Sequence, residues 1–338
     1  MKNILNTLVE YKSLDKQAAK EILVRLAQGE FNQSQMAAFL TVFLMRSITV
    51  EELEGFQEAM LELCVPLNIA EYDAIDLCGT GGDGKNTFNI STTASFVVAG
   101  AGQNVAKHGN NGVSSVCGSS NLLAHFGYEF TNDANKPKKS LDQAGIWFLH
   151  APLFHPAMKN VAPVRRELGM KTFFNMLGPM VNPSFPKKQL VGVFNLELAR
   201  LYAYLFQKSD KQFVILHSLD GYDEISLTGS FRMITNDGEY LLRPEDLGFQ
   251  THRPEDLYGG ETVKESAKIF LDILNGKGTL AQQEAVVANA GMAIHCGNSS
   301  LTLEESIQRA QISLESGKAL QTFQQLVGKP SVDTPASA

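Results

Sequence analysis

Cysteine is scarce in this chain, with four residues among 338. They are widely scattered and include no C-x-x-C pair: Cys64, Cys78, Cys117 and Cys296. Such spacing does not outline a disulfide framework or a zinc site, and it is typical of reduced thiols in a cytosolic protein. We therefore expect a cytoplasmic protein without structural zinc.

The sequence also lacks long apolar runs and an excess of positive charge. No uninterrupted apolar segment reaches membrane-spanning length, and residues 1–15 lack the apolar core and cleavage site of a secretory signal. The formal net charge of −7 excludes a broad basic surface, although a local basic pocket stays possible. We expect neither nucleic acid nor a membrane as a partner. A hydrophobic fraction of 44% supports one large domain or two modest ones.

Helical patterns alone fill the first 66 residues. Apolar residues recur there at helical spacing, and residues 36–45 are apolar all round, as in a helix at the centre of a bundle. Asp15 and Asn32 are expected at helix starts. A polar break at 67–72 follows, so we predict a helical domain over residues 1–68.

From residue 73 onward, short β-type runs alternate with helical patterns, which indicates an α/β domain with a largely parallel sheet. The expected strands are 74–78, 104–107, 146–149, 190–194 and 212–217, then a meander over 224–243 that includes Ile225–Leu227 and a turn at 236–238. Helices are expected over 157–168, 172–177 and 262–327. The predicted fold is a small all-helical domain plus a larger α/β domain, residues 73–328, whose central sheet is flanked by helices; residues 329–338 form a tail.

A cluster of glycines stands at the start of the α/β section. Residues 79–84 follow the first expected strand and hold four glycines in six positions. Such density suits a backbone that turns with positive φ or approaches a ligand closely. A small-residue helix running to about Gly100 follows, with Asn89 or Ser91 as N-cap, so that its free N–H groups point back toward the loop. The pattern predicts a phosphate site, and its alternative is a tight connection without a ligand.

The same loop satisfies the dinucleotide fingerprint G-x-G-x-x-G through Gly79, Gly81 and Gly84. Two features weigh against that interpretation. The helix of a dinucleotide site begins at the third glycine, whereas residues 85–90 intervene here. The carboxylate expected about 20 residues further on is replaced by Lys107-His108, which suits another phosphate and not a ribose diol.

Three further polar groups are candidates whose role the residues alone leave open. Residues 107–110, Lys-His-Gly-Asn, form either an ordinary strand-end turn or part of the phosphate site. Arg165 and Arg166 are adjacent on a helix and cannot share one face, so one of them is expected at the surface or in a salt bridge. Asp223 and Glu224 form either a solvated acidic turn or ligands for Mg²⁺, which prefers oxygen donors and substrate phosphates.

Several motifs, in this order and at this spacing, resemble anthranilate phosphoribosyltransferase. They are Cys78–Gly84 (CGTGGDG), Thr87–Thr92 (TFNIST), Lys107–Asn110 (KHGN), Gly118–Ser120 (GSS), Val164–Gly169 (VRRELG), Phe174–Pro179 (FNMLGP) and Asp220–Glu224 (DGYDE). The resemblance is dense from about residue 75 to 228. It departs at Asn111, where the family commonly has Arg or an aromatic residue, and at Val116-Cys117, where a basic or polar pair is commoner.

The resemblance implies transfer of the 5-phosphoribosyl group of phosphoribosyl pyrophosphate to the amine of anthranilate, releasing pyrophosphate, in tryptophan biosynthesis. It implies two Mg²⁺ ions per active site and a homodimer formed through the helical domain, which residues 157–183 complete. The implied phosphoribosyl pyrophosphate site is Gly79, Gly81, Gly82, Asp83, Thr87, Asn89, Ser91, Thr92, Lys107 and Ser119. The implied anthranilate site is Gly79, His108, Asn110 and Arg165, and the implied metal ligands are Ser91, Asp223 and Glu224.

No residue stands out as a covalent nucleophile, and the implied chemistry requires none. Two other functions are weighed against the transferase. A pyrimidine nucleoside phosphorylase shares the fold and the glycine-rich loop, but it binds inorganic phosphate and a nucleobase instead of a diphosphate with metal ions. A non-catalytic relative that binds nucleic acid requires a basic groove, against which the net charge of −7 speaks.

Overall fold

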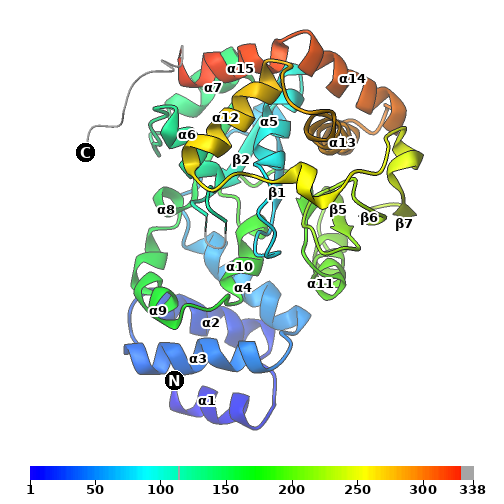
Figure 1. The fold of residues 1–338 in the computed structure, drawn as a ribbon. Coiled ribbons are helices and arrows are strands. Elements are labelled where there is room, and N and C mark those ends of the chain that lie inside the picture. The colour runs from blue at the N-terminus through cyan, green and yellow to red at the C-terminus, as the bar shows by residue number, and fades with distance from the viewer. Residues whose placement is uncertain (113–114, 329–338) are drawn as a thin grey trace. The chain divides into compact units, whose positions relative to one another are not determined.

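The computed structural model describes residues 1–112 and 115–328, so the predicted tail lies outside the described residues. The chain forms two compact units: Met1–Leu67 together with Ala151–Pro183, and Asn68–His150 together with the residues from Ser184 onward (Figure 1). Within the described ranges, none of the helices combines the length and the apolarity that crossing a membrane requires.

The first unit is helical. Its N-terminal part contains α1 (Lys2–Val9), α2 (Lys16–Ala27), α3 (Gln33–Met45) and α4 (Val50–Glu62). Its second part adds α8 (Ala151–Phe154), α9 (Ala162–Leu168), α10 (Phe174–Leu177) and 3₁₀ turns at Pro156–Asn160 and Gly178–Met180. Asp15 caps α2 by accepting a hydrogen bond from the Ala18 N–H, and Asn32 forms a capping box with Gln35, as the sequence predicts.

Phenylalanines join the two parts of this unit. The Phe56 ring of α4 stacks on Phe173 with centroids 4.4 Å apart, and Phe39 and Phe43 of α3 meet Phe173 edge to face. Aromatic contacts of this kind contribute beyond the area they bury. At the chain crossing, the Leu67 N–H donates to the Pro183 carbonyl at 2.9 Å. One core therefore holds residues that are more than a hundred positions apart.

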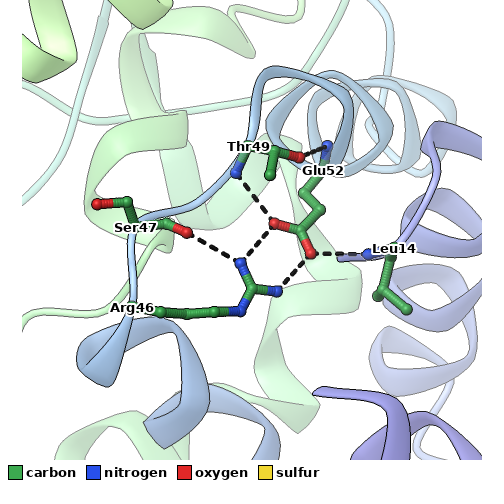
Figure 2. Close-up of polar contacts among 5 residues, drawn as sticks. All are labelled: Leu14, Arg46, Ser47, Thr49 and Glu52. Carbon is green, nitrogen blue, oxygen red and sulfur yellow. Dashed lines mark hydrogen bonds and ion pairs between the residues drawn. The ribbon is translucent and has the colours of Figure 1, made fainter. Parts of the chain in front are cut away.

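A buried carboxylate ties three segments of the same unit (Figure 2). Glu52 of α4 has no exposed surface, and its oxygens accept hydrogen bonds from the Leu14 and Thr49 N–H groups at 2.9 and 3.0 Å. The Arg46 guanidinium donates two more bonds, at 2.9 and 2.5 Å. Because a buried charge is tolerated only when its hydrogen bonds are made, removing Arg46 is expected to cost about 3–5 kcal/mol of stability.

The second unit is built on a seven-stranded sheet of order β3-β2-β1-β4-β5-β6-β7. The first five strands are parallel and match the expected runs: β1 (Ile75–Gly79), β2 (Val105–Gly109), β3 (Ile146–His150), β4 (Lys188–Gly192) and β5 (Gln212–Ser218). The antiparallel strands β6 (Phe231–Thr235) and β7 (Glu239–Leu242) form a hairpin around the predicted turn at 236–238.

Helices cover this sheet, which confirms the predicted fold class. They are α5 (Ile90–Gly100), α6 (Ser119–His125), α7 (Lys136–Ala144), α11 (Leu196–Gln207), α12 (Val263–Leu274), α13 (Leu280–Gly297), α14 (Leu303–Glu315) and α15 (Lys318–Val327), with 3₁₀ turns at Ala70–Tyr72, Pro244–Leu247 and Pro254–Leu257. Helix α13 is buried along most of its length and packs against α5, α14 and β4 (Figure 1).

One predicted strand is wrong. Residues 225–227 form a buried loop and not a strand, and Leu227 has a φ of +57°, which a strand does not allow. The loop crosses the end of the sheet instead of joining it.

The strand order reverses at β1. The chain runs from β1 outward to β2 and β3, then returns to β4 on the other side of β1. In open α/β sheets, ligands bind outside the carboxyl ends of the strands at such a reversal. The carboxyl ends here are Gly79 of β1 and Gly192 of β4, which are register partners.

Candidate active site

The glycine loop follows β1, where the strand order reverses. The Thr80 N–H donates to the Gly192 carbonyl at 2.9 Å and fixes the start of the loop beside β4. Gly81, Gly82 and Gly84 have φ values of +67°, +79° and +76°, as the glycine density predicts. A Cβ on Gly81 or Gly84 would meet nothing within 4 Å, so the positive φ, and not crowding by the protein, accounts for these glycines.

Helix α5 begins at Ile90, six residues past the third glycine, which agrees with the argument against a dinucleotide site. The structure confirms one of the two predicted N-cap positions of α5. Asn89 is the N-cap residue, but its side chain makes no cap bond and donates to the Cys117 carbonyl at 2.9 Å. The N–H of Ser91 instead donates to the Glu224 carboxylate.

Asp223 and Glu224 therefore join the loop to the helix. Asp223 Oδ2 accepts a hydrogen bond from the Gly81 N–H at 2.6 Å. Glu224 Oε1 accepts one from the Ser91 N–H at 3.0 Å. The two carboxylates lie beside the groups expected to hold phosphate, and the alternative of a solvated acidic turn is wrong because Asp223 is buried.

Two glycines at the strand ends make room for the acidic loop. A Cβ on Gly79 would lie 2.2 Å from Asp223 Oδ2, and one on Gly192 would lie 1.5 Å from the Asp223 carbonyl oxygen. Neither approach is sterically possible with a side chain present. Gly192 is a site residue that the sequence reasoning missed, because a single glycine at the end of an apolar strand carries no signal of its own.

Burial, together with neighbouring negative charge, raises the pKa values of these carboxyls. Burial, followed by the charges of Glu224 and Asp83, raises the pKa of Asp223 well above its usual range. Burial raises the pKa of Glu224 to about 7, although hydrogen bonds from Ser91 and the charge of Lys107 oppose the shift. Desolvation and like charge both penalise the ionised forms, so a cation bound beside Asp223 and Glu224 would stabilise them.

Lys107 lies next to Ser91 and is buried. The alternative of a solvated lysine at the end of a strand is therefore wrong. Its side chain is 2% exposed, and its ammonium donates to the Leu77 carbonyl at 2.5 Å and to Ser91 Oγ at 3.4 Å. Burial lowers its pKa, while the nearby acids, including Glu224, act in the opposite direction. The site thus holds one buried cation beside its buried anions.

The donor set fits Mg²⁺. Two carboxylates and the Ser91 hydroxyl, all oxygen donors, meet within one hydrogen-bonded group, which suits a hard cation that is shared with substrate phosphates. Glu224 Oε2 is buried and, among the described residues, has no hydrogen-bond partner, which leaves a lone pair for a ligand. Thr80 Oγ1 is orphaned in the same way. Nowhere among the described residues are three or more His, Cys, Asp or Glu side chains arranged to hold a metal, so a cation here would depend on the two carboxylates, the hydroxyl and oxygens of the substrate.

Three more of the predicted residues of this unit lie after the loop in the sequence, at Thr87, Thr92 and Ser119. Thr87 pairs with Tyr258 in an antiparallel bridge, and Thr92 is buried in the first turn of α5. Ser119 begins α6 and donates from Oγ to the Asn110 carbonyl at 3.3 Å.

His108 is buried in β2 next to Lys107, and its N–H donates to Asp76 Oδ1 at 3.2 Å. Asn110 follows β2, and its Oδ1 accepts a hydrogen bond from the N–H of Asn111, the exposed residue at which the chain departs from the family pattern. Strand β2 thus carries Lys107 and His108 on successive positions.

Arg165 belongs to the helical unit, whereas the other predicted site residues belong to the second unit. It is half-buried on α9, where its guanidinium lies over the Phe174 ring at 5.0 Å and donates to Asn175 Oδ1 at 3.4 Å. Burial lowers its pKa. Arg166 is exposed, so the prediction that the pair divides between two environments is confirmed.

Comparison with known families finds both parts of a glycosyl transferase in the chain. Residues 2–64 match the model of the glycosyl transferase family, helical bundle domain, and residues 71–320 match that of the glycosyl transferase family, a/b domain. The class of protein that the fold and the loop indicate is therefore a glycosyl transferase of this two-part family.

Curated relatives narrow the class. The chain is 61% identical to anthranilate phosphoribosyltransferase from Flavobacterium psychrophilum, over 96% of this chain and 98% of the relative. It is 53% identical to the enzyme of that name from Cytophaga hutchinsonii, over 97% of this chain and 100% of the relative. The chain belongs to the anthranilate phosphoribosyltransferase family.

Solved structures agree. Anthranilate phosphoribosyltransferase from Thermus thermophilus matches with a TM-score of 0.89 and 32% identity, covering 96% of this chain and 98% of that one. The enzyme from Saccharomyces cerevisiae in complex with PRPP (phosphoribosyl pyrophosphate) and Mg matches with a TM-score of 0.88 and 26% identity, covering 96% of each chain.

Proposed function

We propose that the chain transfers the 5-phosphoribosyl group of phosphoribosyl pyrophosphate to the amine of anthranilate, with release of pyrophosphate, and that it acts in tryptophan biosynthesis. The observation that supports this most strongly is the hydrogen bonding of Asp223 and Glu224 to the Gly81 and Ser91 amides. These hydrogen bonds bring oxygen ligands for a cation to the glycine loop and to the start of α5, the two elements that suit a diphosphate.

We assign the diphosphate to the glycine loop and the N-terminal turn of α5. The residues of this assignment are Gly79, Gly81, Gly82, Asp83, Thr87, Asn89, Ser91, Thr92, Lys107 and Ser119. Backbone N–H groups of the loop and the positive end of α5 favour an anion, and the ammonium of Lys107 adds a charge that stays in place because the side chain is buried.

Asp223, Glu224 and Ser91 would hold Mg²⁺, with two ions per site as the proposal. Bound Mg²⁺ neutralises charge on the diphosphate and makes it a better leaving group. The chain's own contribution is the placement of the two carboxylates, which hydrogen bonds from Gly81 and Ser91 orient before any ligand arrives.

We assign anthranilate to Gly79, His108, Asn110 and Arg165. A planar guanidinium suits the acceptor carboxylate, and Arg165 is held in one orientation by Phe174 and Asn175. The amine of anthranilate is largely unprotonated at neutral pH, so no strong base is required. Catalysis then rests on binding the leaving group and positioning the amine against the ribose carbon that pyrophosphate leaves.

We further propose a cytoplasmic homodimer formed through the helical unit. Four free, buried cysteines suit a reducing compartment. Val9, Tyr11 and Met45 of the helical unit are large apolar side chains that are mostly exposed, which suits an interface. Light scattering of wild type and of the Met45→Glu variant tests the dimer, and an unchanged mass distribution would place the interface elsewhere.

The substrate test is a comparison of three reactions. We expect anthranilate fluorescence to disappear only when phosphoribosyl pyrophosphate and Mg²⁺ are both present. A pyrimidine nucleoside with inorganic phosphate should give no base release, and duplex DNA should not bind at low salt. Phosphorolysis, or DNA binding that weakens steeply with salt, would favour the corresponding alternative function.

A further inference from the structure

The acidic pair lies in a loop whose backbone is buried. Ile225 and Ser226, the two residues after Glu224, have no exposed surface. A buried backbone N–H or carbonyl must find a partner, and a loop outside a sheet does not obtain one from a neighbouring strand. Side chains bond to the backbone of residues 224–226, whereas the Leu227 carbonyl accepts a hydrogen bond from the backbone N–H of His252 at 2.8 Å.

Asn289 supplies the central partner. It lies in the middle of α13, is 1% exposed, and accepts a hydrogen bond at Oδ1 from the Ile225 N–H at 3.1 Å. Its Nδ2 donates to the Ile225 carbonyl at 2.9 Å and to the Ala285 carbonyl at 2.8 Å. Because the amide nitrogen faces two carbonyls, the orientation of the side-chain amide is determined. The Asn289 side chain thus bonds to both the N–H and the carbonyl of Ile225.

An asparagine in this helix costs stability unless its bonds are made. The neighbours of Asn289 along α13 are buried apolar or small residues, and an unpaired amide among them is unfavourable. An apolar residue at position 289 would leave the Ile225 N–H and carbonyl without their partner. The asparagine is therefore explained by the hydrogen bonds that Ile225 needs, and not by the packing of the helix.

Two other elements support the same loop. Ser218, the last residue of β5, donates from Oγ to the Glu224 carbonyl at 2.7 Å. Gly192, the last residue of β4, leaves space for the backbone of Asp223. Helix α13 and two strand ends thus meet around three consecutive residues, 223–225.

We propose that Asn289 is a positioning residue for the metal and diphosphate site. By holding Ile225 at both its N–H and its carbonyl, it sets the preceding carboxylates on the Gly81 and Ser91 amides. Ser218, at the end of β5, likewise holds the Glu224 carbonyl by a hydrogen bond. The inference rests on the proposed role of Asp223 and Glu224 as ligands of a metal-bound diphosphate.

The test is the affinity for Mg²⁺ with inorganic pyrophosphate, measured by titration calorimetry on the full chain. Asn289→Ala is expected to weaken binding at least tenfold, because the acidic pair loses its alignment. The matched control is Asn236→Ala. Asn236 also bridges a backbone N–H and a carbonyl, those of Phe213 and Lys211 at 2.9 and 2.8 Å, but at the opposite end of β5.

Both variants should lose thermal stability, whereas only Asn289→Ala should lose affinity. Ser218→Ala removes a single bond to Glu224 and is expected to weaken binding about fivefold, so it serves as a second test if Asn289→Ala does not fold. Wild-type affinity in the variants at positions 289 and 218, or equal weakening in the control, would overturn the inference. A wild-type protein that does not bind Mg²⁺ with pyrophosphate would instead overturn the proposed site itself.

Discussion

Replacing Glu224 by glutamine should stabilise the protein above neutral pH while impairing its site. The carboxylate is buried near Asp223 and Asp83, so its charge is unfavourable when no cation is bound, although Ser91 and Lys107 offset part of that cost. Glutamine keeps the shape of the side chain and an oxygen that accepts the Ser91 N–H, but it carries no charge. The change therefore removes the electrostatic cost and leaves the hydrogen bond.

The size of the stability change and its pH window follow from the pKa of Glu224. Burial raises the pKa of Glu224 from 4.5 to about 7, so the folded protein binds this proton more tightly than the unfolded chain does. The resulting stability is complete below pH 4.5 and is lost as the pH rises through about 7. Each pH unit between the two pKa values is worth about 1.4 kcal/mol, which gives about 3 kcal/mol in all.

The assay is urea unfolding from pH 5 to pH 9 in metal-free buffer without phosphate. Glu224→Gln should exceed wild type by less than about 1 kcal/mol at pH 5 and by about 3 kcal/mol above pH 8. Glu129→Gln, at an exposed position, is the control and should follow the wild-type profile. A Glu224→Gln variant that is less stable than wild type at pH 8, or a difference that does not change with pH, would refute the reasoning.

The other predictions concern the two substrates. Gly81→Ala places a side chain at a φ of +67° at a cost of about 1–2 kcal/mol and should sharply raise the KM for phosphoribosyl pyrophosphate. Gly276→Ala, with a φ of +71° and open space around it, should lose similar stability with unchanged KM, and equal kinetics for both variants would remove the loop from the site. Arg165→Ala should raise the KM for anthranilate about tenfold or more with little change for the other substrate. Arg166→Ala is its exposed control, and equal losses for both substrates in Arg165→Ala would make Arg165 structural.

Local chemistry was enough to predict the framework. Five parallel strands lie within two residues of their expected bounds, because buried runs such as 146–149 are apolar and end at turns. The glycine loop was predicted for a related reason, since positive φ at Gly81 and Gly84 is a property of the residue type. The misassigned strand at 225–227 shows the limit of this approach. Its apolar pattern indicates burial, but Ile225 bonds to the distant side chain of Asn289 instead of to a neighbouring strand.

The site was predictable only in part. The sequence marks Asp223 and Glu224 as candidates, but their contacts with Gly81 and Ser91 cross more than 130 positions and depend on the sheet order. Asn89 was predicted as one of two N-cap candidates of α5, but the sequence gives no sign that the Glu224 carboxylate, from a distant loop, accepts the Ser91 N–H of that first turn. Asn289 carries no local signal, since one polar residue in an apolar helix has no pattern.

The central claim is that the acidic pair and the glycine loop hold a metal-bound diphosphate for phosphoribosyl transfer. The most direct measurement is the rate of phosphoribosyl-anthranilate formation against Mg²⁺ concentration, for wild type and for the double variant Asp223→Asn with Glu224→Gln. Wild type should form product and pyrophosphate in equal amounts, stop on chelation and recover with Mg²⁺, while the double variant needs at least about tenfold more Mg²⁺ without losing thermal stability. A wild-type enzyme that turns over without divalent cations, or a double variant with the wild-type Mg²⁺ dependence, would contradict the claim.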